Sequence, residues 1–174
     1  MKTFFASLLV TFLFFSLSPM VDAKPASKVK SKNSAERQHD YEEALTALKS
    51  QTFLLSFYSF VDQTGNLIEL EPEGNFILVN KDSFVMQKSV SLISNTFSGS
   101  ANLKGEFSNY HLKVSHKGNI QFSFVISEGK KGLTFKGKMN HGDNSIEGTI
   151  KGKIEEHQIN VSGNVQPVQT HFVY

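Results

Sequence analysis

The feature that most constrains the fold is a regular alternation of apolar and polar residues over residues 119–165. Four successive segments share it, and each places an apolar residue or a glycine at every second position. A period of two puts alternate side chains on opposite faces of a β-strand. Only short turn-forming stretches separate the segments, and short turns join antiparallel neighbours because parallel pairing needs long crossovers. The stretch therefore predicts four consecutive antiparallel strands.

Glycines recur on the apolar side of the predicted strands. They stand at Gly105, Gly137, Gly148, Gly152 and Gly163. Glycine weakens an ordinary strand, but it lets a strand coil inward without a side-chain clash, as a barrel requires. It also leaves space inside the barrel, and the sequence allows two ways of filling that space. One is tight packing of the rings of Phe122, Phe124 and Phe135; the other is a small ligand in a cavity.

The opposite face of the same strands is polar and charged. It carries Lys136, Lys138, Glu147, Thr149, Lys151 and Lys153. A membrane barrel would show an apolar band to the lipid and a polar lumen. These lysines do not suit lipid, and the glycine-rich apolar face does not suit a water channel. The pattern predicts a water-soluble barrel or sandwich, and the aromatic C-terminal residue Tyr174 does not outweigh it.

Residues 1–23 have the features of a secretory signal peptide, with a positive charge, an apolar run and a small-residue cleavage site. The alternative, a membrane anchor, needs about 20 apolar residues, and the run is shorter. Residues 24–35 predict a flexible basic linker, and residues 36–174 a single β domain. The chain has no cysteine, so its core alone must hold it together. We expect an exported protein, periplasmic or extracellular.

The rest of the chain predicts one helix and further strands. Residues 34–50 place apolar side chains at i, i+3, i+4 and i+7, on one helical face. Asp40 and Glu43 stand at capping-box spacing, so we expect the well-formed part of the helix to begin at Tyr41. Strand patterns occur at 51–61, 67–70, 76–79, 83–90, 101–107 and 110–114. The fold predicted is all-β: an antiparallel meander of about ten strands, forming a barrel or barrel-like sandwich, with one short N-terminal helix.

Spaced single residues carry a family resemblance over residues 36–168. They are Glu43-Ala44-Leu45 before Thr52-Phe53, Gly74-Asn75-Phe76-Ile77 before Asn80-Lys81-Asp82, Gln87, Gly105 with Asn109, Gly118-Asn119-Ile120, and Val161-Ser162-Gly163. In these the chain resembles an uncharacterised domain-of-unknown-function family of exported proteins from Bacteroidetes-type bacteria. The resemblance implies an envelope location and an all-β domain. It implies no activity, so no functional residue is carried over.

The histidines are the obvious titratable candidates, but their spacing does not predict a metal site. His111 and His116 fall on opposite faces of a strand by parity. His141 and Asp143 share a turn and would need a third ligand to hold a metal ion. Neither a His-x-His nor a His-Glu-x-x-His spacing occurs in the sequence.

Other catalytic groups lack partners as well. Cysteine is absent, and Ser98-Gly99-Ser100 is not a nucleophile elbow. Acid pairs at 42–43, 71–73 and 155–156 are typical of exposed charge. Asn160-Val161-Ser162 spells a glycosylation sequon inside a predicted strand. The sequence therefore predicts a protein that is not an enzyme, with no catalytic, cofactor-binding or metal-binding residue and no cofactor.

We expect an exported, non-enzymatic envelope protein whose partner is a small apolar ligand or another envelope protein. In one hypothesis the barrel interior binds the apolar ligand. In the alternative a solid-core structural or interaction module acts through its surface or its basic tail. A net charge of +2 is too mild to indicate nucleic acid, and no transmembrane segment is expected after residue 23. A hydrolase would need a cleft that gathers His141 or His116 with two acids.

Overall fold

The computed structural model describes residues 33–62, 64–88, 102–152 and 158–168, all of which fall within one compact unit. The predicted signal peptide and most of the predicted linker lie outside these residues. So do the irregular stretch 91–100, the acid pair at 155–156 and the aromatic C-terminus.

The described residues form one α-helix, one short 3-10 helix and nine strands. In chain order these are α1 (Ser34–Ser50), β1 (Thr52–Val61), β2 (Leu67–Glu69), η1 (Pro72–Gly74), β3 (Phe76–Asn80), β4 (Ser83–Gln87), β5 (Asn102–Val114), β6 (Ile120–Glu128), β7 (Lys131–Met139), β8 (Ser145–Gly152) and β9 (Gln158–Pro167). Every strand pairing is antiparallel, as the short turns predicted.

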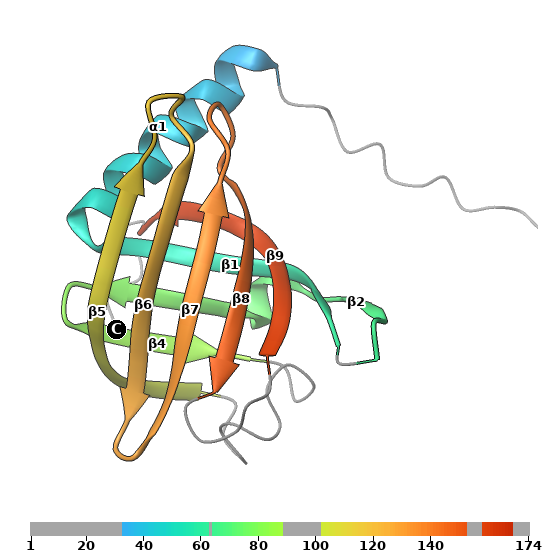
Figure 1. Ribbon diagram of the computed structural model, residues 1–174, viewed down its shortest axis with the longest axis vertical. Helices are drawn as coiled ribbons and strands as arrows, with labels where there is room; N and C mark the ends of the chain where they lie inside the picture. Colours follow the sequence, from blue (N-terminus) through green and yellow to red (C-terminus); the bar gives the residue numbers. More distant parts are fainter. Residues whose placement is uncertain (1–32, 63, 89–101, 153–157, 169–174) are drawn as a thin grey trace, which may run out of the picture. The chain divides into compact units, whose positions relative to one another are not determined.

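The sheet closes on itself, which confirms the barrel. The strand order is β1-β3-β4-β5-β6-β7-β8-β9, and β9 pairs back to β1. The extra strand β2 pairs only with the end of β1. In Figure 1, β1 and β4 run across the strands β5 to β8, and β9 curves from one direction into the other. The eight-stranded barrel is therefore built as two layers whose strands cross, with the core between them.

Strand β5 explains why nine strands stand where about ten were predicted. The two patterns at 101–107 and 110–114 belong to this one strand, which carries a β-bulge. The register shifts between Ser108, which pairs with Val125, and His111, which pairs with Ser123. Asn109 lies at the bulge with φ +52°, a left-handed conformation that Asn adopts more readily than most residues. A bulge reverses the inward and outward parity, so a single strand reads as two.

Helix α1 has the predicted range of residues 34–50, but the prediction that its well-formed part begins at Tyr41 was wrong. Its N-cap is Asn33, whose Oδ1 accepts a hydrogen bond of 2.7 Å from the backbone N–H of Glu36. Asp40 and Glu43 lie within the helix, because a capping-box spacing also occurs by chance in a polar helix. The helix includes Ser34 and Ala35, the last two residues of the predicted linker.

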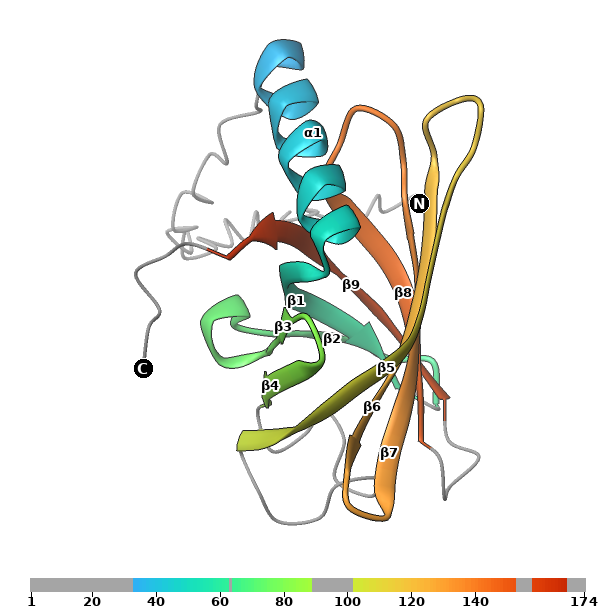
Figure 2. The same ribbon diagram turned by 90° about the vertical axis from the view of Figure 1, so that its left-hand side faces the viewer.

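One face of α1 packs against β1 and β9. Its buried residues are Tyr41, Ala44, Ala47 and Leu48. The Tyr41 hydroxyl donates a 2.6 Å hydrogen bond to the Gly118 carbonyl in the β5–β6 turn, and the Tyr110 hydroxyl donates a 2.8 Å bond to the Leu48 carbonyl. Figure 2 shows the helix alongside the hairpin turns at one end of the barrel. The helix is therefore fixed to the barrel by hydrogen bonds as well as by apolar contact.

The core consists of the apolar side of the strands, as predicted. Gly137 and Gly152 are buried with the aromatic residues, whereas Lys136 and Lys151 are exposed. The rings of Phe124 and Phe135 stack at 5.0 Å, and Phe107 lies 5.2 Å from Phe124. A Cβ on Gly137 would lie 2.7 Å from Phe135 Cε1 and 2.8 Å from Phe122 Cζ. The space that these glycines leave is therefore occupied by phenylalanine rings.

Candidate functional site

A trough of about 910 Å³ lies on the outer face of the five strands β5 to β9. Its lining comes from three adjacent rows of the sheet, with one residue per strand in each row. Strands in a sheet lie about 4.8 Å apart, so a row that spans five strands is about 19 Å long. The trough therefore has the length of an extended molecule and runs across the strands rather than along them.

The middle row forms the floor. In register it is Leu112, Phe122, Gly137, Gly148 and Val161. These side chains belong to the inner face, and Phe122 and Val161 are only 3% and 2% exposed. Gly137 and Gly148 pair with each other at the centre of the row and have no side chain. The floor is therefore mostly backbone, supported from inside by aromatic rings.

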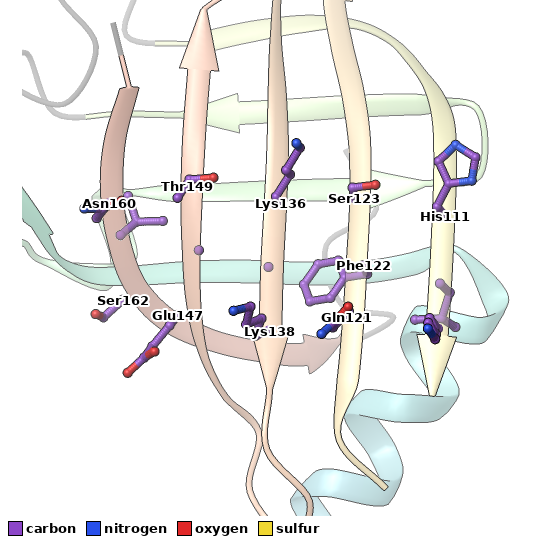
Figure 3. A pocket seen from close by; sticks show the side chains of 15 residues that line it. His111, Gln121, Phe122, Ser123, Lys136, Lys138, Glu147, Thr149, Asn160 and Ser162 are labelled. Carbon is purple, nitrogen blue, oxygen red and sulfur yellow. The ribbon is translucent and has the colours of Figure 1, made fainter. Parts of the chain in front are cut away.

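Polar side chains line both sides of the floor. The first row is His111, Ser123, Lys136, Thr149 and Asn160, and the second is Lys113, Gln121, Lys138, Glu147 and Ser162. Figure 3 shows the labelled members of the two rows on either side of Phe122. Residues two apart on a strand are about 7 Å apart, which sets the separation of the rows. All ten side chains can donate or accept hydrogen bonds.

The bulge in β5 places one end of the trough. Before the bulge Leu103 and Phe107 face inward, and after it Leu112 does. His111 and Lys113 are exposed on the outer face as a result. Tyr110, next to the bulge, is half-buried and bonded to the helix. The same local irregularity therefore joins the strand to α1 and completes the two polar rows.

Charge is divided unequally along the trough. Strands β5 to β7 contribute three lysines, Lys113, Lys136 and Lys138, together with His111 and two amide or hydroxyl side chains. Strands β8 and β9 contribute Glu147 with three uncharged hydroxyl and amide side chains. Lys138 and Glu147 are direct cross-strand partners at the boundary. The trough thus has a cationic end and a hydroxyl-rich end with one carboxylate.

Tyr58 on β1 lies near the hydroxyl-rich end of the trough. It sits where the register between β1 and β9 shifts, and its side chain is 41% exposed. Burial raises the pKa of its phenol, and the Asp143 and Glu147 carboxylates raise that pKa further. The phenol is therefore within electrostatic reach of Glu147, although it does not line the trough itself.

Of the histidines singled out from the sequence, only His111 lines the trough. His116 is exposed in the β5–β6 turn. The ring of His141 stands 4.9 Å from that of Tyr41 and packs on Gly118, and its backbone N–H donates to Asn119 Oδ1 at 3.0 Å. His141 therefore joins the helix to two hairpin turns.

The acidic candidates are on the surface or take part in local structure. Asp143 Oδ1 accepts a 3.0 Å hydrogen bond from the backbone N–H of Ser145. On the helix, Glu42 accepts from Gln38, and exposed Glu43 pairs with His39 at 3.3 Å. Glu71 and Glu73 are exposed. Among the described residues, no group of three His, Asp or Glu side chains is placed to hold a metal ion.

Asn160, the first residue of the sequon, is exposed in the trough. The rest of the trough was missed by the sequence analysis, which identified the outward face but not which outward residues are neighbours. The available signal was the recurrence of Lys, Thr, Ser and Asn at the outward positions of β6 to β9. Strand register is needed to turn that signal into two rows.

The sequence profile of a domain of unknown function, DUF4251, matches residues 35–165. The chain belongs to the DUF4251 family. Its fold is similar to that in a crystal structure of a DUF4251 family protein from Bacteroides eggerthii DSM 20697. The TM-score is 0.67 at 24% sequence identity, and the match covers 78% of this chain and 92% of that one. These findings confirm the resemblance to an uncharacterised bacterial domain and the fold.

Comparison with curated proteins gives no significant match. In the described part of this DUF4251 protein, no helix has the length and apolar character needed to cross a membrane.

Proposed function

We propose that this DUF4251 domain is an exported, non-enzymatic binding module that holds its ligand in the outer trough. The observation that carries the proposal is the placement of ten polar side chains in register around a hollow of about 910 Å³. Ligand sites are concave, and their polar groups fix the orientation of the ligand. Of the functions expected from the sequence, this is the solid-core module that acts through its surface.

The interior is less suited to a ligand. A small apolar molecule beside Gly148 would compete with the Phe135 ring, whose Cζ lies 2.7 Å from the position of an added Cβ. Phe135 also packs against Phe57, Phe122 and Phe124 at 5.0–6.2 Å between ring centroids. Displacing rings from such a close-packed core costs several kcal/mol, about 3–5 for a buried phenylalanine. These contacts favour the outer face.

The arrangement of the trough also supports binding rather than catalysis. His111 and Glu147 are its histidine and its carboxylate, and they lie three strands apart in the sheet. Three inter-strand spacings amount to about 14 Å, well beyond the reach of a shared proton. Lys138 is next to Glu147, but an exposed Lys–Glu pair of this kind is typical of surface charge.

The test blocks the trough without disturbing the core. Tyrosine is a good strand residue, so Ser123→Tyr with Thr149→Tyr fills the centre of the trough from two outward positions. Val85→Tyr is the matched control, because Val85 is a half-buried residue between the buried Phe84 and Met86 on β4 and does not line the trough. The full chain and both variants are titrated with a panel of neutral and acidic oligosaccharides and with the apolar probe 1-anilinonaphthalene-8-sulfonate.

We expect at least one saccharide to bind the parent chain and Val85→Tyr equally, and to lose binding in the blocked variant. The proposal would be wrong if no saccharide bound and the folded parent chain bound the apolar probe stoichiometrically. If the blocking substitutions left that binding unchanged, the barrel interior would be the ligand site instead. A panel in which nothing binds would also contradict the proposal.

A further inference from the structure

We infer that the ligand of the trough is a linear acidic saccharide, a polyhydroxylated chain that carries carboxylates. This inference rests on the proposed function and adds the chemical class of the ligand. It assigns the carboxylates to the β5–β7 end of the trough and uncharged sugar hydroxyls to the β8–β9 end.

The cationic end sets the requirement for negative charge. Lys136 and Lys138 stand in different rows on the same strand, on opposite sides of the floor, so two lysines line the space in which an anionic group would lie over Gly137. Lys113 continues the second row two strands away. Hydrogen bonds from an ammonium to a carboxylate are about twice as strong as neutral ones, so this end selects an anion.

The remaining lining selects hydroxyl groups. Ser123, Thr149 and Ser162 offer hydroxyls, and Gln121 and Asn160 offer amides, each of which both donates and accepts. Glu147 accepts hydrogen bonds from ligand hydroxyls. A ligand that faces side chains of this kind along about 19 Å must itself carry donors and acceptors at short intervals, because an unpaired polar group loses more than a paired one gains. Sugar chains have that character.

A peptide fits the trough less well. A peptide that adds a strand lies along a free sheet edge, whereas β6 to β9 are paired on both sides in the trough. The trough residues of β5 pair with β6, and β4 pairs with residues 102–106, so a strand added to β5 would lie beside the trough and not across it. A helical or extended peptide otherwise anchors apolar side chains in pockets. The floor offers none, since its residues Phe122 and Val161 turn inward and are almost fully buried.

Single-stranded nucleic acid fits less well again. Its bases stack on aromatic side chains in succession, and in the trough Phe122 is buried beneath the floor, which leaves the single imidazole of His111 exposed. The net charge of +2 also gives little attraction to a phosphate backbone. Tyr58, beyond the hydroxyl-rich end, is a half-exposed ring within electrostatic reach of Glu147, and it suits one terminal sugar rather than a run of bases.

The experiment titrates the full chain with oligogalacturonate, a linear chain of carboxylated sugars, by isothermal calorimetry at low salt. Its methyl-esterified form is the neutral control for the ligand. Lys136→Gln with Lys138→Gln removes the paired charges, and Lys104→Gln is the matched protein control, since Lys104 is exposed on β5 but outside the trough. Poly-L-glutamate and a single-stranded DNA oligomer represent the other polyanions.

We expect oligogalacturonate to bind and the double variant to weaken binding about tenfold or more, because two charge-assisted contacts are lost. The Lys104→Gln variant should stay within about twofold, and added salt should weaken binding by the parent chain. A circular dichroism spectrum of each variant checks the fold.

Other outcomes separate the inference from the proposed function. Equal binding of the methyl ester, or an equal loss in Lys104→Gln, would overturn the acidic saccharide. If a neutral saccharide binds and is lost in the Ser123→Tyr, Thr149→Tyr variant, the trough is the site but the charge assignment is wrong. Tighter, Lys136-dependent binding of poly-L-glutamate or DNA would replace the saccharide with that polyanion. Failure of every ligand to bind would contradict both statements.

Discussion

The two faces of strands β5 to β9 are made from the same segments, yet they differ in almost every physical respect. On the inner face, Phe122, Phe124 and Phe135 pack on one another and on glycines with little free space. On the outer face, Lys136, Thr149 and their neighbours stand in two rows on either side of the open trough. The inner side chains are held in place by packing against one another, whereas the outer side chains are exposed and can contact a ligand.

The comparison shows how glycine serves both faces at once. The Gly137–Gly148 pair leaves room beneath the sheet for two phenylalanine rings. The same pair leaves the floor of the trough as bare backbone between two polar rows. Substitutions on the inner face should therefore change stability strongly, and substitutions on the outer face should change it little.

The largest expected effect is that of Phe135→Ala. Phe135 has no exposed surface and contacts three other rings, so its removal leaves a cavity as well as losing burial. We expect the free energy of unfolding to fall by about 3–5 kcal/mol, measured by urea unfolding. The matched control is the next residue, Lys136→Ala, with an expected change below about 0.5 kcal/mol. Similar losses at the two positions would mean that the faces do not differ as described.

A smaller loss is expected from Gly163→Ala. An added Cβ would collide with the Ser56 carbonyl on β1 and lie 3.2 Å from Phe57 Cα, so backbone must move rather than a side-chain tip. Overpacking of this kind costs about 1–3 kcal/mol, which a urea midpoint detects. Gly74→Ala is the control, because a Cβ there meets nothing within 4 Å and should shift stability by less than about 0.5 kcal/mol. An unchanged midpoint for Gly163→Ala would show that β1 and β9 can separate freely.

Tyr110→Phe tests the hydrogen bond that joins β5 to helix α1, next to the bulge. It removes the 2.8 Å hydrogen bond to the Leu48 carbonyl, which keeps its 3.2 Å bond from the backbone N–H of Gln51, for an expected loss of about 1 kcal/mol at pH 8. Burial raises the pKa of this phenol in the folded state, whereas the unfolded chain releases the proton near pH 10.

Because the folded state of the parent chain holds the Tyr110 proton more tightly, its free energy of unfolding should fall as the pH rises above about 10. The Phe variant lacks this proton and should lose less stability between pH 8 and pH 10.5, as followed by urea midpoints. Tyr58→Phe, at an exposed ring, should cost less than about 0.5 kcal/mol at pH 8. If the Phe variant lost as much stability as the parent chain between pH 8 and pH 10.5, the pH dependence could not be assigned to Tyr110.

The inner face and the general fold could be predicted from the sequence because both depend on local patterns. Alternation assigned Phe122 and Gly137 to the core, and a helical pattern gave α1 its full range. The errors came from single residues. Asn109 adds one residue to β5 and made it read as two strands, and the spacing of Asp40 and Glu43 imitated a helix start.

The trough could not be predicted in the same way. Alternation says that Lys138 and Glu147 face outward, but only register makes them neighbours. Register depends on turn lengths and on the shifts at Asn109 and Tyr58, which move whole rows relative to one another. The outer site is therefore a property of the closed sheet rather than of any one segment.

The smallest expected effect is the coupling between Lys138 and Glu147, which are opposite each other on the outer face. A double-mutant cycle with Lys138→Gln and Glu147→Gln should give about 0.2–1 kcal/mol at low salt, the range for exposed opposite charges across a sheet. In 1 M salt the Debye length shrinks to about 3 Å and the coupling should disappear. A coupling above about 2 kcal/mol that persists in high salt would show that the Lys138–Glu147 pair stabilises the fold. The two side chains could then not give up their mutual contact to bind a ligand.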